Sequence, residues 1–155
     1  MRDHALLLLR IAWSVGLLLV SGAGLRKARS GAAGTAPMIA SLGAPFTSGP
    51  EIWAGAAMSA ELVIPFFIFF GFMSRFAALI GGIHFAVATY AHLVIWQQPA
   101  NSVVFSESDP SGVGSLWWMA ACLVIVWHGS GRFSLDQRIA DGPGDTYSLD
   151  KEKGE

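Results

Sequence analysis

The chain has 155 residues, of which 53% are hydrophobic and only 14% charged, and its formal net charge is −1. Soluble domains carry charges at about a quarter of their positions, so this chain has too few charges to cover a soluble globule. The near-zero net charge gives no electrostatic footprint for nucleic acid. The single cysteine, Cys122, excludes an internal disulfide framework and a cysteine-rich zinc site. The composition predicts one compact helical domain in a lipid bilayer.

Residues 5–25 form the first predicted span, an apolar run interrupted by Arg10. At about 1.5 Å per residue, this run is long enough to cross a hydrocarbon core of about 30 Å. Arg10 lies near the N-terminal end, so we expect its side chain to extend back to the interface. A secretory signal peptide with Arg2 at its charged end is the alternative, but the length of the run favours a span.

Residues 26–50 begin with three basic residues and continue with Gly, Ala, Ser, Thr and Pro. Within them, residues 38–42 form a short apolar piece bounded by Pro37 and by the Gly-Ala-Pro of residues 43–45. This piece is too short to span a bilayer, so we expect an interfacial or re-entrant segment.

Three further apolar runs predict three further spans, at residues 52–72, 76–96 and 113–128. The short connection at residues 73–75 forces the second and third spans into an antiparallel hairpin. The predicted fold is therefore an antiparallel four-helix transmembrane bundle, with the re-entrant or interfacial segment after the first helix. It occupies residues 1–139, and residues 140–155 form a polar, flexible tail.

The basic residues are distributed unequally between the two sides of this bundle. One side carries Arg2, Arg10, Arg75, Arg132, Arg138, Lys151 and Lys153. The other side carries only Arg26, Lys27 and Arg29. Because cytoplasmic loops are enriched in Lys and Arg, this bias predicts that both termini are cytoplasmic.

Short motifs at characteristic separations run along the whole chain. They are LLRI at residues 8–11, GLRK at 24–27, SLGAP at 41–45, Glu61-Leu62 followed by Gly71 and Arg75, and GSGRFSLD at 129–136. Together they resemble the DoxX family of small four-helix bacterial inner-membrane proteins. Members of that family are linked to thiosulfate oxidation with quinone as acceptor, to partnership with redox proteins, or to no defined role. This chain departs from the family pattern at Ile64-Pro65, where small residues are usual.

Glu61 is the first candidate for a catalytic residue, because an acid near the bilayer midplane costs at least a few kcal/mol unless it is paired, protonated or hydrated. Pro65 has no N–H group, so it cannot form the usual helix hydrogen bond to the carbonyl of Glu61. That carbonyl lies at the same level of the bundle as the carboxyl group. One interpretation is a proton-accepting site beside a bound quinone or similar ligand. The other is a structural carboxyl group that is hydrogen-bonded to a neighbouring helix.

His84 is the second catalytic candidate. Counted from the turn near Ser74, the depths of Glu61 and His84 differ by only about 4–5 Å. A hydrogen bond between them is therefore expected if both face inward, and it would suit proton transfer coupled to quinone chemistry. The alternative is a histidine bonded to a backbone carbonyl.

Five residues are candidates for ligand binding: Arg26, Lys27, Trp13, Tyr90 and His92. Arg26 and Lys27 would contact an anion or a lipid headgroup, or act as interfacial anchors. Trp13 and Tyr90 would stack on a flat ligand, or pack. His92 is separated from His84 by about 12 Å along the helix axis and about 80° around it. The two histidines therefore lack the i, i+4 spacing of a shared metal site, and neither metal nor haem is predicted.

The remaining charged residues have structural interpretations. Arg75 is a topology charge at the turn, and Arg132 and Asp136 are expected to pair with each other.

The favoured function is a membrane subunit of a redox system that binds a quinone or lipid-like ligand and works with a redox or membrane partner protein. Whether the chain is itself an enzyme stays open. The alternative is a non-catalytic scaffold that anchors a partner, and close-packing glycines would also allow a homo-oligomer.

Overall fold

The computed structural model describes residues 2–21, 23–105 and 113–141, and the predicted flexible tail lies outside this range from residue 142 onward. Most of the described residues are helical, joined by short turns and loops, and an isolated bridge pairs Phe105 with Val113. The first half contains α1 (Arg2–Val15), the π-helical η1 (Gly16–Ser21), α2 (Ala23–Ala40) and α3 (Pro50–Phe70). The second half contains α4 (Ser74–Tyr90), the π-helical η2 (Ala91–Ile95), the 3₁₀ turn η3 (Ala100–Val103), α5 (Ser115–His128) and α6 (Leu135–Asp141).

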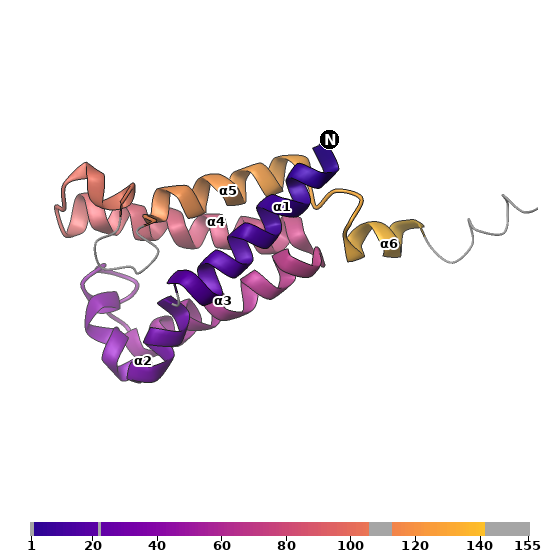
Figure 1. Ribbon diagram of the computed structural model, residues 1–155. Helices are drawn as coiled ribbons and strands as arrows, with labels where there is room; N and C mark the ends of the chain where they lie inside the picture. Colours follow the sequence, from indigo (N-terminus) through magenta and orange to yellow (C-terminus); the bar gives the residue numbers. More distant parts are fainter. Residues whose placement is uncertain (1, 22, 106–112, 142–155) are drawn as a thin grey trace, which may run out of the picture.

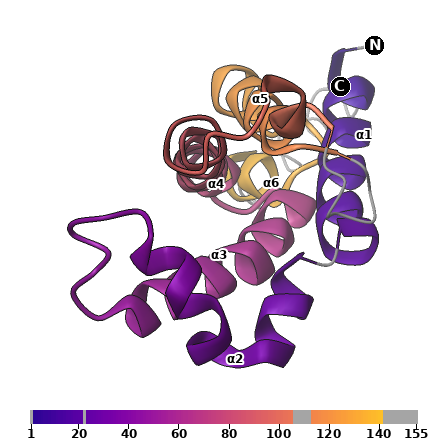
Figure 2. The same ribbon diagram turned by 90° about the vertical axis from the view of Figure 1, so that its left-hand side faces the viewer.

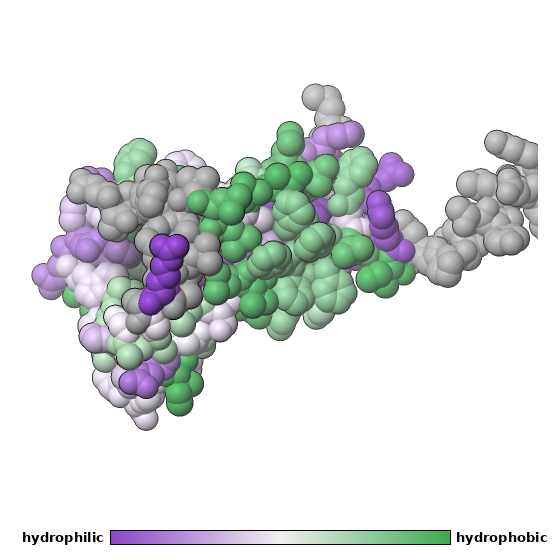
Figure 3. Space-filling model, turned by 60° about the horizontal axis from the view of Figure 1, so that its bottom comes forward, coloured by the Kyte–Doolittle hydropathy of each residue, from purple (hydrophilic) through white to green (hydrophobic). Residues whose placement is uncertain are grey.

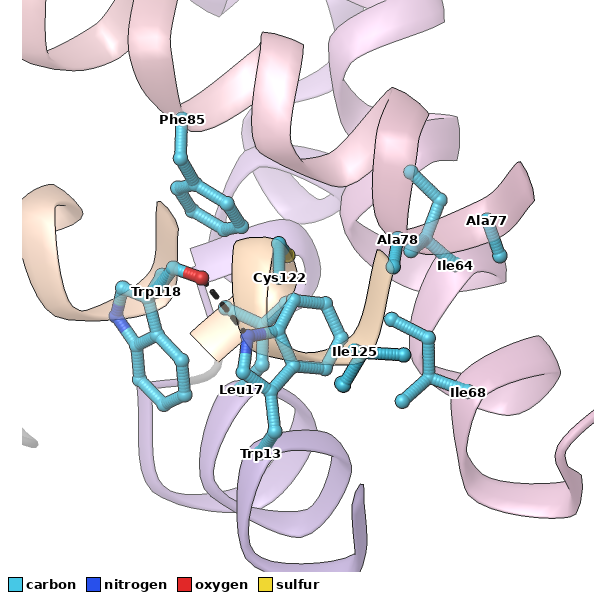
Figure 4. Close-up of a cluster of buried hydrophobic side chains, with 10 residues drawn as sticks. All are labelled: Trp13, Leu17, Ile64, Ile68, Ala77, Ala78, Phe85, Trp118, Cys122 and Ile125. Carbon is cyan, nitrogen blue, oxygen red and sulfur yellow. Dashed lines mark hydrogen bonds between the residues drawn. The ribbon is translucent and has the colours of Figure 1, made fainter. Parts of the chain in front are cut away.

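The hydrophobic core lies where α1, α3, α4 and α5 pack together (Figures 1 and 2). Its buried members, drawn in Figure 4, are Trp13, Leu17, Ile64, Ile68, Ala77, Ala78, Phe85, Trp118, Cys122 and Ile125. Trp13 lies edge-on to Phe85 and Trp118, and its indole N–H donates to the Trp118 carbonyl oxygen at 3.2 Å. A buried tryptophan needs such an acceptor, which fixes the orientation of α1 against α5.

The outer surface of this core is apolar rather than polar. Two helices, Pro50–Phe70 and Ser74–Ile95, are long and apolar enough to cross a membrane, yet only 28% and 22% of their most apolar stretches are buried inside the protein. The core helix of a soluble protein would be mostly buried. Figure 3 shows the apolar residues as a band between two more hydrophilic ends. Exposed apolar faces of this kind are typical of helices that contact lipid.

The segment after the first helix differs from the sequence-based expectation. Residues 38–40 are not a separate apolar piece but the last residues of α2, which reaches back to Ala23. Gly31, with φ 70° and ψ 172°, interrupts the helix and divides α2 into two pieces. The second piece buries Thr35, Ala36 and Ile39 while α2 packs along α3 (Figure 2). Tertiary packing therefore holds a glycine- and proline-containing segment helical against its low intrinsic propensity.

Arg10 is the largest departure from expectation. It does not extend to the interface but is buried, with 1% of its surface exposed. Its Nε and Nη2 atoms donate to the carbonyl oxygens of Ile68 and Phe69 at 2.8 and 2.7 Å. Its Nη1 atom donates to those of Ser130 and Phe133 at 2.6 and 3.1 Å. The last carbonyls of a helix have no partner within the helix, so the guanidinium caps the end of α3.

Asp136 caps the neighbouring helix end. Its carboxylate accepts hydrogen bonds from the backbone N–H groups of Met73 and Ser74 at 2.6 and 3.0 Å, and from the Ser74 hydroxyl at 3.0 Å. The first N–H groups of α4 thereby gain an acceptor that carries negative charge at the positive end of the helix. The predicted pair of Arg132 and Asp136 is wrong: among the described contacts, Arg132 uses its backbone N–H toward Asp3 and exposes its side chain.

The turn between α3 and α4 depends on Gly71. This residue has φ 66°, and a Cβ atom added to it would lie 2.5 Å from the Ser134 Cβ and 2.6 Å from the Arg10 Nη2. Gly71→Ala should therefore lower the free energy of unfolding by about 1–3 kcal/mol, because it combines backbone strain with displacement of the Arg10 cap. Gly55→Ala, at a position with no atom within 4 Å of the new Cβ, is the matched control. Unfolding in mild detergent measures both; equal losses would contradict the prediction.

Candidate functional site between helices α3 and α4

The candidate site lies where the middle of α3 faces the middle of α4. The short turn after Phe70 makes the two helices antiparallel, so residues at similar distances from it share one depth. The His84 Nε2 and the Glu61 Oε1 are 3.0 Å apart. The predicted hydrogen bond between Glu61 and His84 is therefore confirmed. Its role in chemistry stays a prediction.

The two side chains differ in their exposure. Only 4% of the Glu61 side chain is accessible, against 20% of the His84 side chain. Glu61 is thus held inside the protein, while part of the imidazole ring faces the exterior of the bundle. A ligand outside the bundle would meet the ring first and reach the carboxyl group through it.

Small residues allow the helices to come close enough for this contact. A Cβ atom added to Gly81, less than one turn before His84, would lie 3.2 Å from the Cys122 Sγ and 3.4 Å from the Ile64 Cγ2. Gly81 therefore brings α4 against both α3 and α5, and a Cβ added to Gly16 would similarly lie 3.0 Å from Trp118. These glycines serve contacts within one chain. A Cβ added to Gly55 would meet nothing within 4 Å.

The pair has a simple proton chemistry. A neutral carboxyl group beside a neutral imidazole and a carboxylate beside an imidazolium both have zero net charge, and they differ only in the position of one proton. Movement of that proton therefore leaves the buried net charge unchanged. Pro65, fully buried one turn after Glu61, lacks the N–H that would bond the Glu61 carbonyl oxygen.

Among the predicted ligand-binding residues whose side chains are described, Trp13, Tyr90 and His92 have no recorded contact with this pair. Trp13 is buried in the hydrophobic core, with its ring against Phe85 and Trp118, which favours packing over ligand stacking. Tyr90 is 57% exposed near the end of α4. Arg26 and Lys27 lie in α2, and their side chains are outside the described part of the structure.

His92 belongs to a second polar cluster in η2, beyond the end of α4. Its Nδ1 atom is 2.6 Å from the Gln98 side-chain oxygen, and its ring lies edge-on to Trp96 at a centroid distance of 4.9 Å. The Trp96 indole N–H in turn donates to the Ser41 hydroxyl at 2.9 Å, which ties the segment after α2 to η2. These contacts give His92 a local structural role. In the described residues, no group of three His, Cys, Asp or Glu side chains could hold a metal ion.

A comparison with protein families decides which family these features represent. The family model described as DoxX matches residues 5–94, more than half of the chain. The chain belongs to the DoxX family. Family membership and the exposed apolar helices together make it a membrane protein. The DoxX match includes Arg10, Glu61 and His84, and it ends at Val94, one residue before the end of η2. No curated protein and no solved structure gave a match.

Proposed function

We propose that this DoxX protein crosses the bacterial inner membrane four times, with both termini in the cytoplasm. The two long apolar helices support two of the spans. Residues 2–21, which comprise α1 and η1, rise by about 30 Å, enough to match the hydrocarbon core. The apolar α5 is shorter, but it packs with the other three helices around the shared core. The excess of basic residues at the end that carries the N-terminus supports the orientation.

We propose that the protein is a membrane subunit of a redox system and binds a quinone or lipid-like ligand beside Glu61 and His84. The observation that carries this proposal is the 3.0 Å contact between the buried carboxyl group and the partly exposed imidazole. A quinone headgroup has two carbonyl oxygens that accept hydrogen bonds, and its quinol form has two hydroxyl groups that must lose protons on oxidation.

The two side chains would divide this work according to their exposure. The accessible part of His84 would bond the ligand oxygen, and Glu61 would supply or accept the proton through the ring. Reduction of a quinone to its quinol takes up two protons and two electrons, and a redox partner protein would supply the electrons. The family analogy is the transfer of electrons from thiosulfate or another sulfur compound to quinone.

Co-purification tests this function. The protein would be extracted in mild detergent, and the polypeptides and organic-soluble molecules that accompany it would be identified by mass spectrometry. We expect near-stoichiometric quinone with the natural chain and loss of most of it in Glu61→Gln. Glu51→Gln removes an exposed acid from the first turn of the same helix and should retain the quinone. Recovery of a partner protein without quinone would instead favour the scaffold function.

A further inference from the structure

A group of exposed basic residues lies at the end of the molecule that carries the α3–α4 turn and α6 (Figure 1). Three exposed arginines, Arg75, Arg132 and Arg138, belong to this end. Arg75 is the second residue of α4 and lies against the position of Gly129, where an added Cβ would be 3.0 Å from its Nε atom. Arg132 and Arg138 flank Asp136, whose carboxylate is bonded to the first residues of α4. The Asp136 cap therefore holds all three arginines in one region, which we call the basic end.

Two acids, Asp3 and Asp136, also lie at the basic end, and both accept hydrogen bonds from backbone N–H groups. Asp136 accepts the hydrogen bonds of the α4 cap, and Asp3 accepts a backbone N–H from Arg132 at 3.5 Å. Among the described side chains, none forms an ion pair with Arg75, Arg132 or Arg138. The three exposed guanidinium groups thus have no ion-pair partner among the described side chains, and they outnumber the two carboxylates of Asp3 and Asp136 at this end.

Apolar side chains are exposed beside these charges. In the C-terminal segment, Phe133, Leu135 and Ile139 are 50%, 40% and 65% exposed. Leu135 and Ile139 are four residues apart and therefore share one face of α6. At the adjacent turn, Met73 and Phe76 are 50% and 58% exposed. Figure 3 shows hydrophilic residues at this end directly beside the apolar band.

We propose that the basic end binds anionic phospholipid headgroups, with the exposed apolar side chains of α6 and the turn inserted at the acyl boundary. Arginine forms paired hydrogen bonds with phosphate oxygens, and each basic residue near an anionic membrane surface is worth about 1 kcal/mol. Amphipathic segments lie in the interface when apolar residues on one side accompany basic residues on the other. The position of the basic end beside the apolar band places it at the depth of the headgroups.

Lipid titration of the full chain tests this proposal. The purified protein in uncharged detergent would be titrated with phosphatidylglycerol or with phosphatidylcholine, and bound lipids would be counted by native mass spectrometry. We expect phosphatidylglycerol to bind preferentially at low salt. The apparent affinity should fall about fivefold for each arginine replaced by glutamine, and by about a hundredfold in the variant with all three replaced.

Two further sets of variants separate charge at this end from charge in general. The variant with Arg75, Arg132 and Arg138 all replaced by lysine keeps the positive charge and should retain the preference. Arg29→Gln removes an exposed arginine from α2, away from the basic end, and should weaken binding less than Arg138→Gln. Equal losses in those two variants, or no loss in the triple glutamine variant, would overturn the proposal. Residues 142–155 contain four acidic and two basic residues. Lipid binding that appears only after deletion of these residues would also overturn the proposal, because the deleted segment would then be what occupies the basic end in the full chain.

Discussion

Arg10→Leu is expected to lower the free energy of unfolding by at least about 3 kcal/mol, the largest loss for any single side chain described above. The substitution removes four hydrogen bonds of 2.6–3.1 Å at once. Two of the acceptors are carbonyls in the last turn of α3, and the other two lie in the segment that follows α5. Because the hydrogen bonds to Ile68 and Ser130 are buried, water cannot replace those two donors without opening the end of the bundle. Denaturant titration in mild detergent measures the loss.

Two variants show whether geometry or charge is responsible. Arg10→Lys keeps the positive charge, but the three donors of one ammonium group cannot reproduce a planar fork that reaches two separate segments. It should recover less than half of the lost stability. Arg132→Leu removes an exposed arginine from the same end and should change stability by less than about 0.5 kcal/mol. A loss in Arg10→Leu no larger than that in Arg132→Leu would show that the cap is not needed.

The sequence predicted the contact between Glu61 and His84 because the contact depends on local geometry. A short turn makes two consecutive helices antiparallel, and the rise per residue then gives the relative depth of any two positions. The spans at residues 52–72 and 76–96 correspond closely to α3 and to Ser74–Ile95 for the same reason. A long apolar run with clear ends predicts the bounds of its helix from the sequence, because both the length and the ends are local features.

The environment of Arg10 was not predictable in this way. Its acceptors are between 58 and 123 residues away in the chain, and three segments must meet before the site exists. The available signal was chemical: an arginine in an apolar run, together with a helix that ends at a glycine and needs a cation or donor for its last carbonyls. Asp136 follows the same rule at the start of α4. Pairing it with Arg132, its near neighbour in sequence, overlooked the unsatisfied N–H groups of that helix.

The length of α2 was missed for a different reason. Gly31 and Pro37 are signals that end a helix when local propensity decides. Gly31 does divide α2 into two pieces, but Pro37 does not end the second piece, which continues to Ala40 and buries Ile39. Because α2 packs along α3, tertiary contacts outweigh the proline signal. Sequence patterns describe a segment by itself, whereas the helical state of this one depends on its neighbour.

A double-mutant cycle on Glu61 and His84 is expected to give a coupling energy of at least about 1 kcal/mol. Glu61→Leu and His84→Leu each remove the 3.0 Å hydrogen bond, so the double variant should lose less stability than the sum of the two single losses. The cycle of His92→Ala and Gln98→Ala is the matched control, because it joins a histidine to an oxygen acceptor at 2.6 Å in an exposed position. Water competes for that pair, and its coupling should stay below about 0.5 kcal/mol. Unfolding titrations of all variants in one detergent give both values.

The comparison of the two cycles bears directly on the proposed chemistry. Strong coupling at Glu61 and His84 would mean that the two groups share one proton as a unit, so that a ligand bonded to the exposed part of the ring would also affect the carboxyl group. Additive losses would contradict this, and would reduce Glu61 to an acid satisfied by other contacts. Coupling combined with loss of quinone in Glu61→Gln would support the whole proposal. Coupling without any bound quinone would leave the pair as a structural link between α3 and α4, and the protein as a scaffold.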